Sequence, residues 1–186
     1  QDISNWNVSS VVNMEGMFMN SASFNQDISN WDVSNVTILG GNTTRGMFAG
    51  ATSFNQDIGK WDVSKVTNMS GLFLATDFNI DISGWKVSNV VEMSNMFAGS
   101  SFNQNISNWD VSNVTNMQSM FRLATSFNGD ISDWDTSAVT DMHDMFYDAA
   151  AFNQDISNWN VSSVVNMEGM FCNSTSFNQD IGNWDV

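Results

Sequence analysis

Carboxylate side chains recur at two fixed places along this 186-residue chain, and they are the residue type in it best suited to chemistry. One set lies four residues before each tryptophan, with Asn105 in its single gap. Five members could form a row of Ca²⁺ sites: Asp27, Asp57, Asp81, Asp130 and Asp155. Carboxylates bind hard cations, but they also accept hydrogen bonds from backbone N–H groups at chain corners. Both interpretations stay open, and a corner accepts asparagine in place of aspartate, as at Asn105.

A second set follows each tryptophan directly. Its candidate binding residues are Asp32, Asp62, Lys86, Asp110 and Asp135. If each tryptophan and the residue two positions later point inward on a strand, the residue between them points outward. The result would be a flat, mostly acidic ribbon. It would serve either as a recognition surface for a protein or glycan, or as a solvated face that keeps the protein soluble.

An asparagine follows the first phenylalanine of each sequence unit. These asparagines are Asn25, Asn55, Asn79, Asn103, Asn128, Asn153 and Asn178. Short polar side chains commonly bond the backbone of their own or a neighbouring turn. We therefore predict a structural ladder along this column.

Combinations of residues typical of enzymes are missing from the sequence. His143 is the only histidine, and beside Asp144 it is interpreted as a solvated side chain. No Ser-His-Asp set, metal-spaced His/Cys cluster, phosphate-binding loop or dinucleotide fingerprint occurs. Paired carboxylates such as Asp133 and Asp135 have little diagnostic force in a chain with 20 acids. The sequence predicts no catalytic residues.

These side chains are positioned by an internal repeat that is phased on tryptophan. The tryptophans are Trp6, Trp31, Trp61, Trp85, Trp109, Trp134, Trp159 and Trp184, separated by 25, 30, 24, 24, 25, 25 and 25 residues. A period of this length indicates a solenoid or propeller. The spacing of 30 reflects extra residues between Leu39 and Gly46. Such an insertion either marks a binding face or is a tolerated surface bulge.

Two elements are expected in each repeat. The I-S-N-W-D-V stretch has the β-branched and aromatic content of a short strand. The stretch from Val66 to Phe73 places Met69, Leu72 and Phe73 on one helical face, with Thr67 as the N-cap. We therefore predict an α/β repeat solenoid, a right-handed coil with one short parallel strand and one short helical segment per turn of about 25 residues.

Composition restricts the classes of partner. The net charge of −15 opposes binding to nucleic acid. No apolar run is long enough for direct membrane insertion, and Cys172 has no partner for a disulfide. The chain begins and stops in mid-repeat, so we interpret residues 1–186 as one array of about seven repeats, cut from a longer array without end caps. Its apolar ends predict end-to-end association.

The unit F-N-x-D-I-S-x-W-D-V-S-x-V-T-N-M-x-x-M-F-x-x-A resembles the repeat of the BspA-like bacterial surface protein family, a domain of unknown function related to leucine-rich repeats. The resemblance covers essentially the whole chain. It implies a leucine-rich-repeat-like solenoid, an extracellular or cell-surface location and a part in adhesion. It supplies no catalytic residues to carry over.

The sequence thus predicts a non-enzymatic interaction or adhesion module that presents an extended, mostly acidic face to protein or glycan partners and needs no cofactor. The alternative is a spacer or stalk, stiffened by Ca²⁺ or without it, that holds another domain away from the cell surface.

Overall fold

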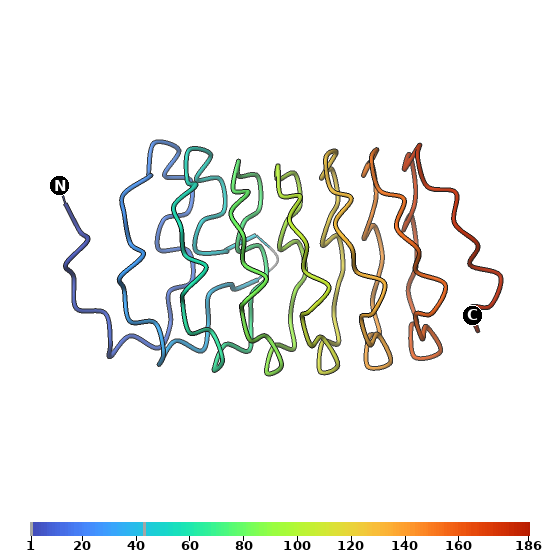
Figure 1. Ribbon diagram of the computed structural model, residues 1–186, viewed down its shortest axis with the longest axis horizontal. Coiled ribbons are helices and arrows are strands. Elements are labelled where there is room, and N and C mark those ends of the chain that lie inside the picture. Colours follow the sequence, from blue (N-terminus) through green and yellow to red (C-terminus); the bar gives the residue numbers. More distant parts are fainter. Residues whose placement is uncertain (1, 43) are drawn as a thin grey trace.

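Successive repeats form similar coils that lie side by side in sequence order. The computed structural model describes residues 2–42 and 44–186, and the chain advances coil by coil along the long axis from one end to the other (Figure 1). Corresponding residues of neighbouring repeats therefore stand next to one another. Every column of side chains in the sequence becomes a row in space.

Backbone hydrogen bonds join neighbouring coils along the segment that starts seven residues after each tryptophan. Within the described residues, β-structure consists of isolated parallel bridges: Asn13↔Ile38, Ile38↔Asn68, Asn68↔Glu92, Glu92↔Asn116, Asn116↔Asp141 and Asp141↔Asn166. Beyond each bridge, every second N–H reaches the next coil. Phe121 N donates to Met145 O at 2.9 Å, and Leu123 N donates to Tyr147 O at 2.7 Å.

No helix occurs in residues 2–42 and 44–186. The expected helix from Val66 to Phe73 is wrong, because Gly71 has a φ of 62°, far from the helical value of about −63°. In addition, Phe73 N donates to Met96 O of the next coil at 2.9 Å. Thr67 is no N-cap, since its N–H and hydroxyl both bond Thr37 O of the preceding coil.

The same left-handed position recurs in most described coils. Positive φ values occur there at Gly16, Gly71, Asn95, Ser119, Asp144 and Gly169. Glycine, asparagine and aspartate are the residues that tolerate this region best. They break the chain into consecutive tight turns, such as the bond from Met120 N to Met117 O at 3.1 Å.

The expected strand over I-S-N-W-D-V is also wrong, because one β-turn forms at the start of this stretch and a second begins at its last residue. Trp134 N donates to Ile131 O at 3.3 Å, and Val139 N donates to Thr136 O at 2.9 Å. The aspartate before each turn accepts a hydrogen bond from the backbone two residues later and so favours the turn over a strand ladder. An α/β coil with a strand and a helical segment per turn is therefore not the fold.

The core is a set of aromatic and aliphatic columns that run through the coils. In each coil two phenylalanines stack on each other, as Phe121 and Phe127 do with ring centroids 3.8 Å apart. Phe121 also stacks on Phe146 of the next coil at 5.7 Å. Ile131, Val139, Met142 and Met145, which recur at fixed positions, are fully buried. Each coil thus buries its apolar layer against the next.

The insertion in the second repeat leaves the stack and returns to it. Met47 N donates to Leu39 O at 2.8 Å, which closes the loop across its base. Arg45 pairs with Glu15 of the first coil at 2.7 Å. A Cβ at position 40 would clash with the Ser70 backbone, so Gly40 permits close approach to the third coil.

Two further expectations concern single features of the chain. Cys172 is a free, exposed thiol. No helix long and apolar enough to cross a bilayer occurs in the described parts of the chain.

Candidate functional site

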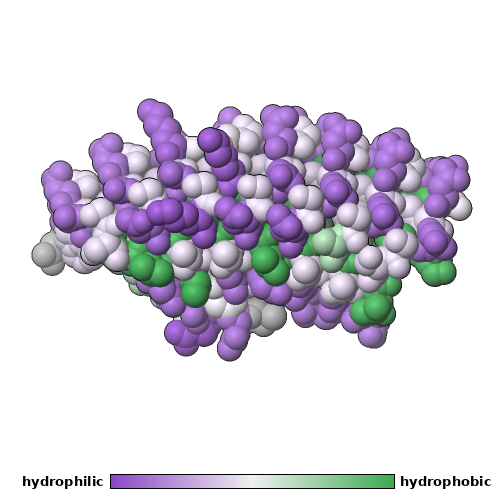
Figure 2. All heavy atoms as spheres, turned by 90° about the horizontal axis from the view of Figure 1, so that it is seen from below, coloured by the Kyte–Doolittle hydropathy of each residue, from purple (hydrophilic) through white to green (hydrophobic). Residues whose placement is uncertain are grey.

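The residues that follow the tryptophans form a row of exposed side chains. Away from the two ends of the array, the two residues that flank each of them are buried, as Trp134 and Thr136 are on either side of Asp135. All five predicted face residues are exposed in successive coils: Asp32, Asp62, Lys86, Asp110 and Asp135. Figure 2 shows hydrophilic groups at regular intervals along one face. We call the row of five the acidic row.

Each aspartate of the acidic row is fixed by its own turn. Asp110 Oδ1 accepts hydrogen bonds from Ser112 N at 3.2 Å and from Ser112 Oγ at 2.6 Å. Hydrogen bonds from the serine side chain and then the serine backbone hold the pKa values of Asp32, Asp62 and Asp135 below the ordinary range. These carboxylates therefore keep a negative charge and a defined direction at neutral pH.

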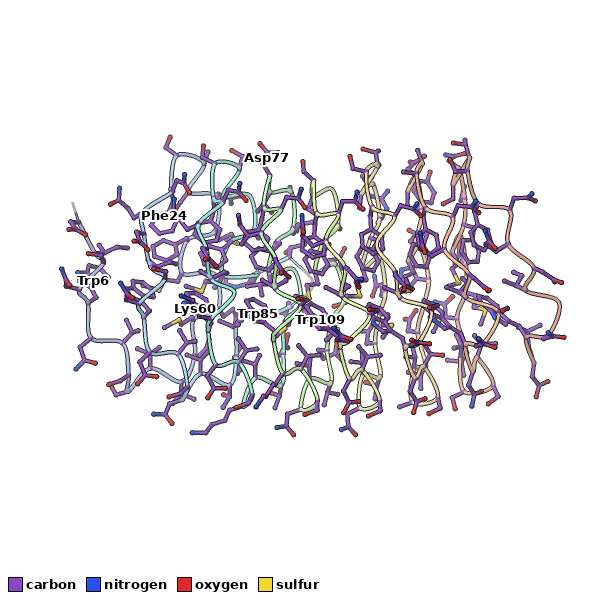
Figure 3. All side chains as sticks on the ribbon, viewed as in Figure 1. Trp6, Phe24, Lys60, Asp77, Trp85 and Trp109 are labelled. Atoms are coloured by element: carbon purple, nitrogen blue, oxygen red, sulfur yellow. The ribbon has the colours of Figure 1, made fainter. Side chains whose placement is uncertain are left out.

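Two adjacent hollows open beside the middle of the acidic row. Their volumes are about 280 Å³ and about 440 Å³, and Gly84 and Lys86 line both. Asp110 lines the first and Asp62 the second. A Cβ at position 84 would meet nothing within 4 Å, so Gly84 keeps the hollow open. Figure 3 shows Lys60, Trp85 and Trp109 following one another along this part of the stack.

Basic residues are concentrated in the same region. Lys60, Lys65 and Lys86 are three of the five lysines and arginines in the chain. Lys60 lines the larger hollow, and Lys65 Nζ donates to Asn35 Oδ1 at 2.7 Å. The acidic row therefore carries a local cationic centre between Asp62 and Asp110.

The aspartates four residues before each tryptophan bond their own turns. Asp27, Asp81, Asp130 and Asp155 each accept a hydrogen bond from the backbone N–H of the serine two residues later, at 2.8–3.0 Å. Asp57 accepts one from Gly59 N at 3.0 Å. Bonds from these serines lower the pKa values of the same four aspartates.

Asn105 shows that this position needs no charge. Its Oδ1 accepts the equivalent bond from Ser107 N at 2.8 Å. Among residues 2–42 and 44–186, no three Asp, Glu, His or Cys side chains lie together as a metal site would require. The geometry thus gives the hypothesis of Ca²⁺ sites no support and matches a corner role.

The asparagine column forms a chain of hydrogen bonds between coils. Asn103 N donates to Asn79 Oδ1, and Asn128 N donates to Asn103 Oδ1, both at 2.8 Å. The bond repeats along the whole column: Asn25, Asn55, Asn79, Asn103, Asn128, Asn153 and Asn178. Each amide oxygen thereby satisfies a backbone donor of the next coil.

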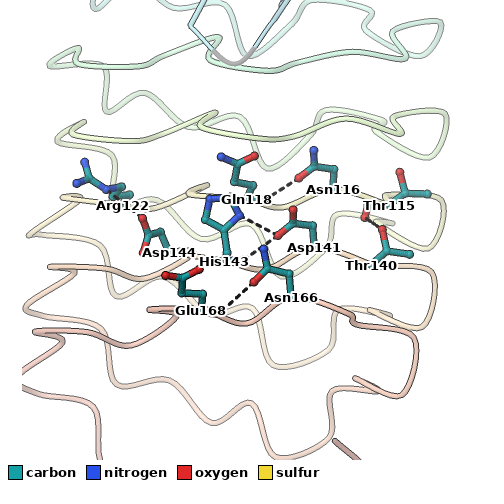
Figure 4. A network of polar contacts seen from close by, with 10 residues as sticks. All are labelled: Thr115, Asn116, Gln118, Arg122, Thr140, Asp141, His143, Asp144, Asn166 and Glu168. Atoms are coloured by element: carbon teal, nitrogen blue, oxygen red, sulfur yellow. Dashed lines mark hydrogen bonds and ion pairs between the residues drawn. The ribbon is translucent and has the colours of Figure 1, made fainter.

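His143 belongs to a polar network on the bridge segments. Its Nδ1 lies 3.1 Å from Asp141 Oδ1, and its side chain is only 27% exposed (Figure 4). It is therefore more buried than the solvated side chain expected from sequence. Asp144 pairs with Arg122 at 3.6 Å, and Glu168 N bonds Asn166 Oδ1. The network joins neighbouring coils and contains no nucleophile paired with a base.

A third hollow, of about 400 Å³, was not anticipated from the sequence. It is lined by Gly41, Asn42, Asn68, Ser70, Glu92, Ser94 and Asn116. The available signal was the side chain nine residues after each tryptophan, which is small in three consecutive repeats, at Gly40, Ser70 and Ser94. These small residues indicate a hollow only once it is known how the insertion lies against the coils, and the sequence pattern does not show that.

Comparison with protein families gives one match. The model described as "Mycoplasma protein of unknown function, DUF285" matches residues 1–106, 34–128 and 92–186. No curated protein and no solved structure matches the chain.

Proposed function

Since the chain belongs to the DUF285 family, whose matched segments together run from residue 1 to residue 186, we propose that it is a non-enzymatic interaction module whose acidic row binds a protein or glycan partner. The observation that carries this proposal is the acidic row itself. Five exposed side chains stand in register on a surface fixed by turns and interlocked coils. Preorganised side chains lose little conformational entropy on binding.

The charge distribution favours a partner with cationic groups. Carboxylates at Asp32, Asp62, Asp110 and Asp135 attract positive charge, and such complementarity raises association rates and specificity. Lys86 interrupts the row at its centre, where a partner would place an acceptor or acidic group opposite it. The two hollows beside Lys86 admit side chains or a sugar residue.

The resemblance to BspA-like repeats supports a more specific setting. Those repeats occur in bacterial surface proteins taken to mediate adhesion. On this basis we place the module at an extracellular surface, where the array presents the acidic row to another cell or to matrix. The alternative is a spacer, for which the continuous phenylalanine columns would supply stiffness.

Substitution of Asp62, Asp110 and Asp135 by asparagine tests the function. Asn7 and Asn160 occupy the same position in other repeats and accept the same turn hydrogen bonds, so the triple variant should fold. Protein and glycan arrays would identify ligands of the unaltered chain, and affinities would then be compared. We expect at least a tenfold weaker Kd for the variant.

A matched control carries Asp57→Asn, Asp81→Asn and Asp130→Asn. These changes remove the same charge from the column of residues four positions before each tryptophan, which we call the corner column. Asn105 shows that this column accepts asparagine. The control should bind like the unaltered chain. If the two triple variants weaken binding equally, net charge and not the acidic row is responsible. An absence of any ligand on the arrays would favour the spacer.

A further inference from the structure

The third hollow lies on a different segment of the coils from the acidic row. Glu92, in its lining, is six residues beyond Lys86, and a β-turn closed by the bond from Val90 N to Val87 O at 2.8 Å separates the two. No member of the acidic row lines it. Any ligand bound there would be recognised by other side chains.

A local reduction in side-chain size creates this hollow. Nine residues after successive tryptophans the chain carries Glu15, Gly40, Ser70, Ser94, Gln118, His143 and Glu168. Ser70 and Ser94 are 2% and 1% exposed, and their Oγ atoms lie 3.1 Å apart at the floor. The larger side chains before and after them leave a depression about three coils wide.

The insertion supplies one wall. Gly41 and Asn42 line the hollow, and the pairing of Arg45 with Glu15 fastens the loop to the first coil. Arg45 N also donates to Asn42 O at 2.8 Å. Gly41 and Asn42 thus lie beside the coils in which the residue nine positions after the tryptophan is smallest.

The lining combines amide donors with a carboxylate acceptor. Asn68 Oδ1 and Asn116 Oδ1 accept hydrogen bonds from Ser70 N and Gln118 N, both at 2.9 Å. Each amide oxygen is therefore committed to its own turn, and the Nδ2 groups are the donors. Glu92 lies in the coil between these two asparagines. Its burial raises the pKa of its carboxyl, while the Asn116 side chain opposes the rise.

These groups select one class of ligand. Apart from Gly41, the lining residues are asparagine, serine and glutamate, so an apolar ligand would leave their donors and acceptors unpaired. Glu92 and the net charge of −15 disfavour an anion. A ligand with adjacent hydroxyl groups fits better, because each hydroxyl can donate a hydrogen bond to the Glu92 carboxylate and accept one from an asparagine amide. A volume of about 400 Å³ is within the range of small-molecule sites.

We propose that the hollow lined by Gly41 and Asn42 of the insertion and by Asn68, Glu92 and Asn116 binds a single neutral sugar residue, either free or at the end of a glycan. The site is independent of the acidic row. A module with both surfaces would hold a glycosylated partner by its sugar and by its cationic groups.

Asn116→Asp is the most informative variant. Asp141 occupies the same position in the next coil and accepts the same turn bond, so the variant should fold while it loses the Nδ2 donor. The reverse change, Asp141→Asn, alters the same column outside the hollow and is the matched control. Ser94→Gln is the second variant, because it fills the floor with the side chain found at Gln118.

Binding would be measured by NMR titration with glucose, galactose, mannose and N-acetylglucosamine. With at least one sugar we expect shifts of the Asn68 and Asn116 side-chain signals. Asn116→Asp and Ser94→Gln should each weaken binding at least tenfold, whereas Asp141→Asn and the triple acidic-row variant should bind normally. The last comparison separates failure of this site from failure of the acidic row.

Three results would overturn the proposal. One is the absence of any shift at Asn68 and Asn116 with these sugars at tens of millimolar. A second is unchanged sugar affinity in folded Ser94→Gln. The third is a salt-sensitive shift with butylamine and none with the sugars, which would assign the hollow to a cationic group.

Discussion

The indole Nε1 of Trp134 donates a hydrogen bond to the backbone carbonyl oxygen of Ile106 in the preceding coil, at 3.1 Å. The same bond to the isoleucine of the preceding coil is made by every tryptophan from Trp31 to Trp184. Around the tryptophans, the backbone N–H groups of the two turns bond carbonyl groups of the same coil. The indole side chains therefore join neighbouring coils here, as backbone hydrogen bonds do along the segments with the β-bridges.

Replacing Trp134 by phenylalanine should destabilise the array. The change removes one of the two hydrogen bonds that the Ile106 carbonyl oxygen accepts, while the bond from Trp109 N at 3.1 Å remains. The lost bond costs about 0.5–1.5 kcal/mol, and the smaller ring adds a packing loss. Urea unfolding would measure the difference in free energy. Trp6→Phe is the control, because Trp6 is 50% exposed and its replacement should cost less than about 0.5 kcal/mol. Equal losses at both sites would argue against the indole bond as the cause.

Left-handed backbone positions offer a second test. Leu123 has a φ of 60° and is 43% exposed, so Leu123→Gly should stabilise the chain by about 1 kcal/mol through relief of backbone strain. Gly99 has a φ of 62°, and a Cβ there would meet only Ala75 at 3.9 Å. Gly99→Ala should therefore destabilise by about 1 kcal/mol for conformational reasons alone.

Gly84→Ala is the matched control for these substitutions. Gly84 lies outside the left-handed region and has open space around its Cα. Alanine there should be neutral or stabilising by up to about 1 kcal/mol. Thermal unfolding of the three variants under one set of conditions would check the signs. A stabilising Gly99→Ala would mean that this backbone does not need a left-handed residue.

The repeat and its core could be predicted from sequence because they depend on residue identity at fixed spacing. Phenylalanine and isoleucine recur at the positions of Phe127 and Ile131, and methionine or, at Leu72, leucine recurs at the position of Met145. Phe127, Ile131, Met145 and Leu72 are all buried in the stack. The alternation around Trp134 likewise placed Asp135 on the surface. An alternation of buried and exposed residues occurs both in a strand and in two consecutive turns, however. The pattern therefore predicted correctly that Asp135 is exposed but predicted the wrong backbone conformation.

The prediction of local structure failed at residues whose own backbone preferences, and not the spacing of apolar residues, determine the conformation. Met69, Leu72 and Phe73 fit a helical face, but Gly71 between them takes a left-handed conformation. Asp130 and Asp135 precede turns because their carboxylates bond the backbone two residues later. The hollow beside Ser70 and Ser94 depends on contacts between coils and the insertion, which the spacing within one repeat does not encode.

The turn-capping aspartates predict a loss of stability in acid. Hydrogen bonds from the Ser132 backbone and side chain lower the pKa of Asp130 below its usual 3.8 when the chain is folded. The unfolded state then binds more protons, so this contribution is complete above the unfolded pKa and is lost as pH falls through the folded value. Asp130→Asn should flatten the fall in unfolding free energy as the pH drops below about 4.

Urea unfolding at a series of pH values would measure that slope. Asp133→Asn changes a neighbouring exposed carboxylate and is the control. If Asp130→Asn and Asp133→Asn alter the slope equally, general charge repulsion and not the turn hydrogen bond explains the acid sensitivity.

Removal and addition of Ca²⁺ test the remaining interpretation of the corner column. Each aspartate from Asp27 to Asp155 bonds the backbone of its own turn, and no metal-sized cluster of acidic side chains lies among the described residues. We therefore expect the same melting temperature in EDTA and in millimolar Ca²⁺. Binding of Ca²⁺ to the folded state alone would raise stability by mass action. A rise of several degrees that Asp57→Asn, Asp81→Asn and Asp130→Asn together abolish would establish a metal-binding column after all.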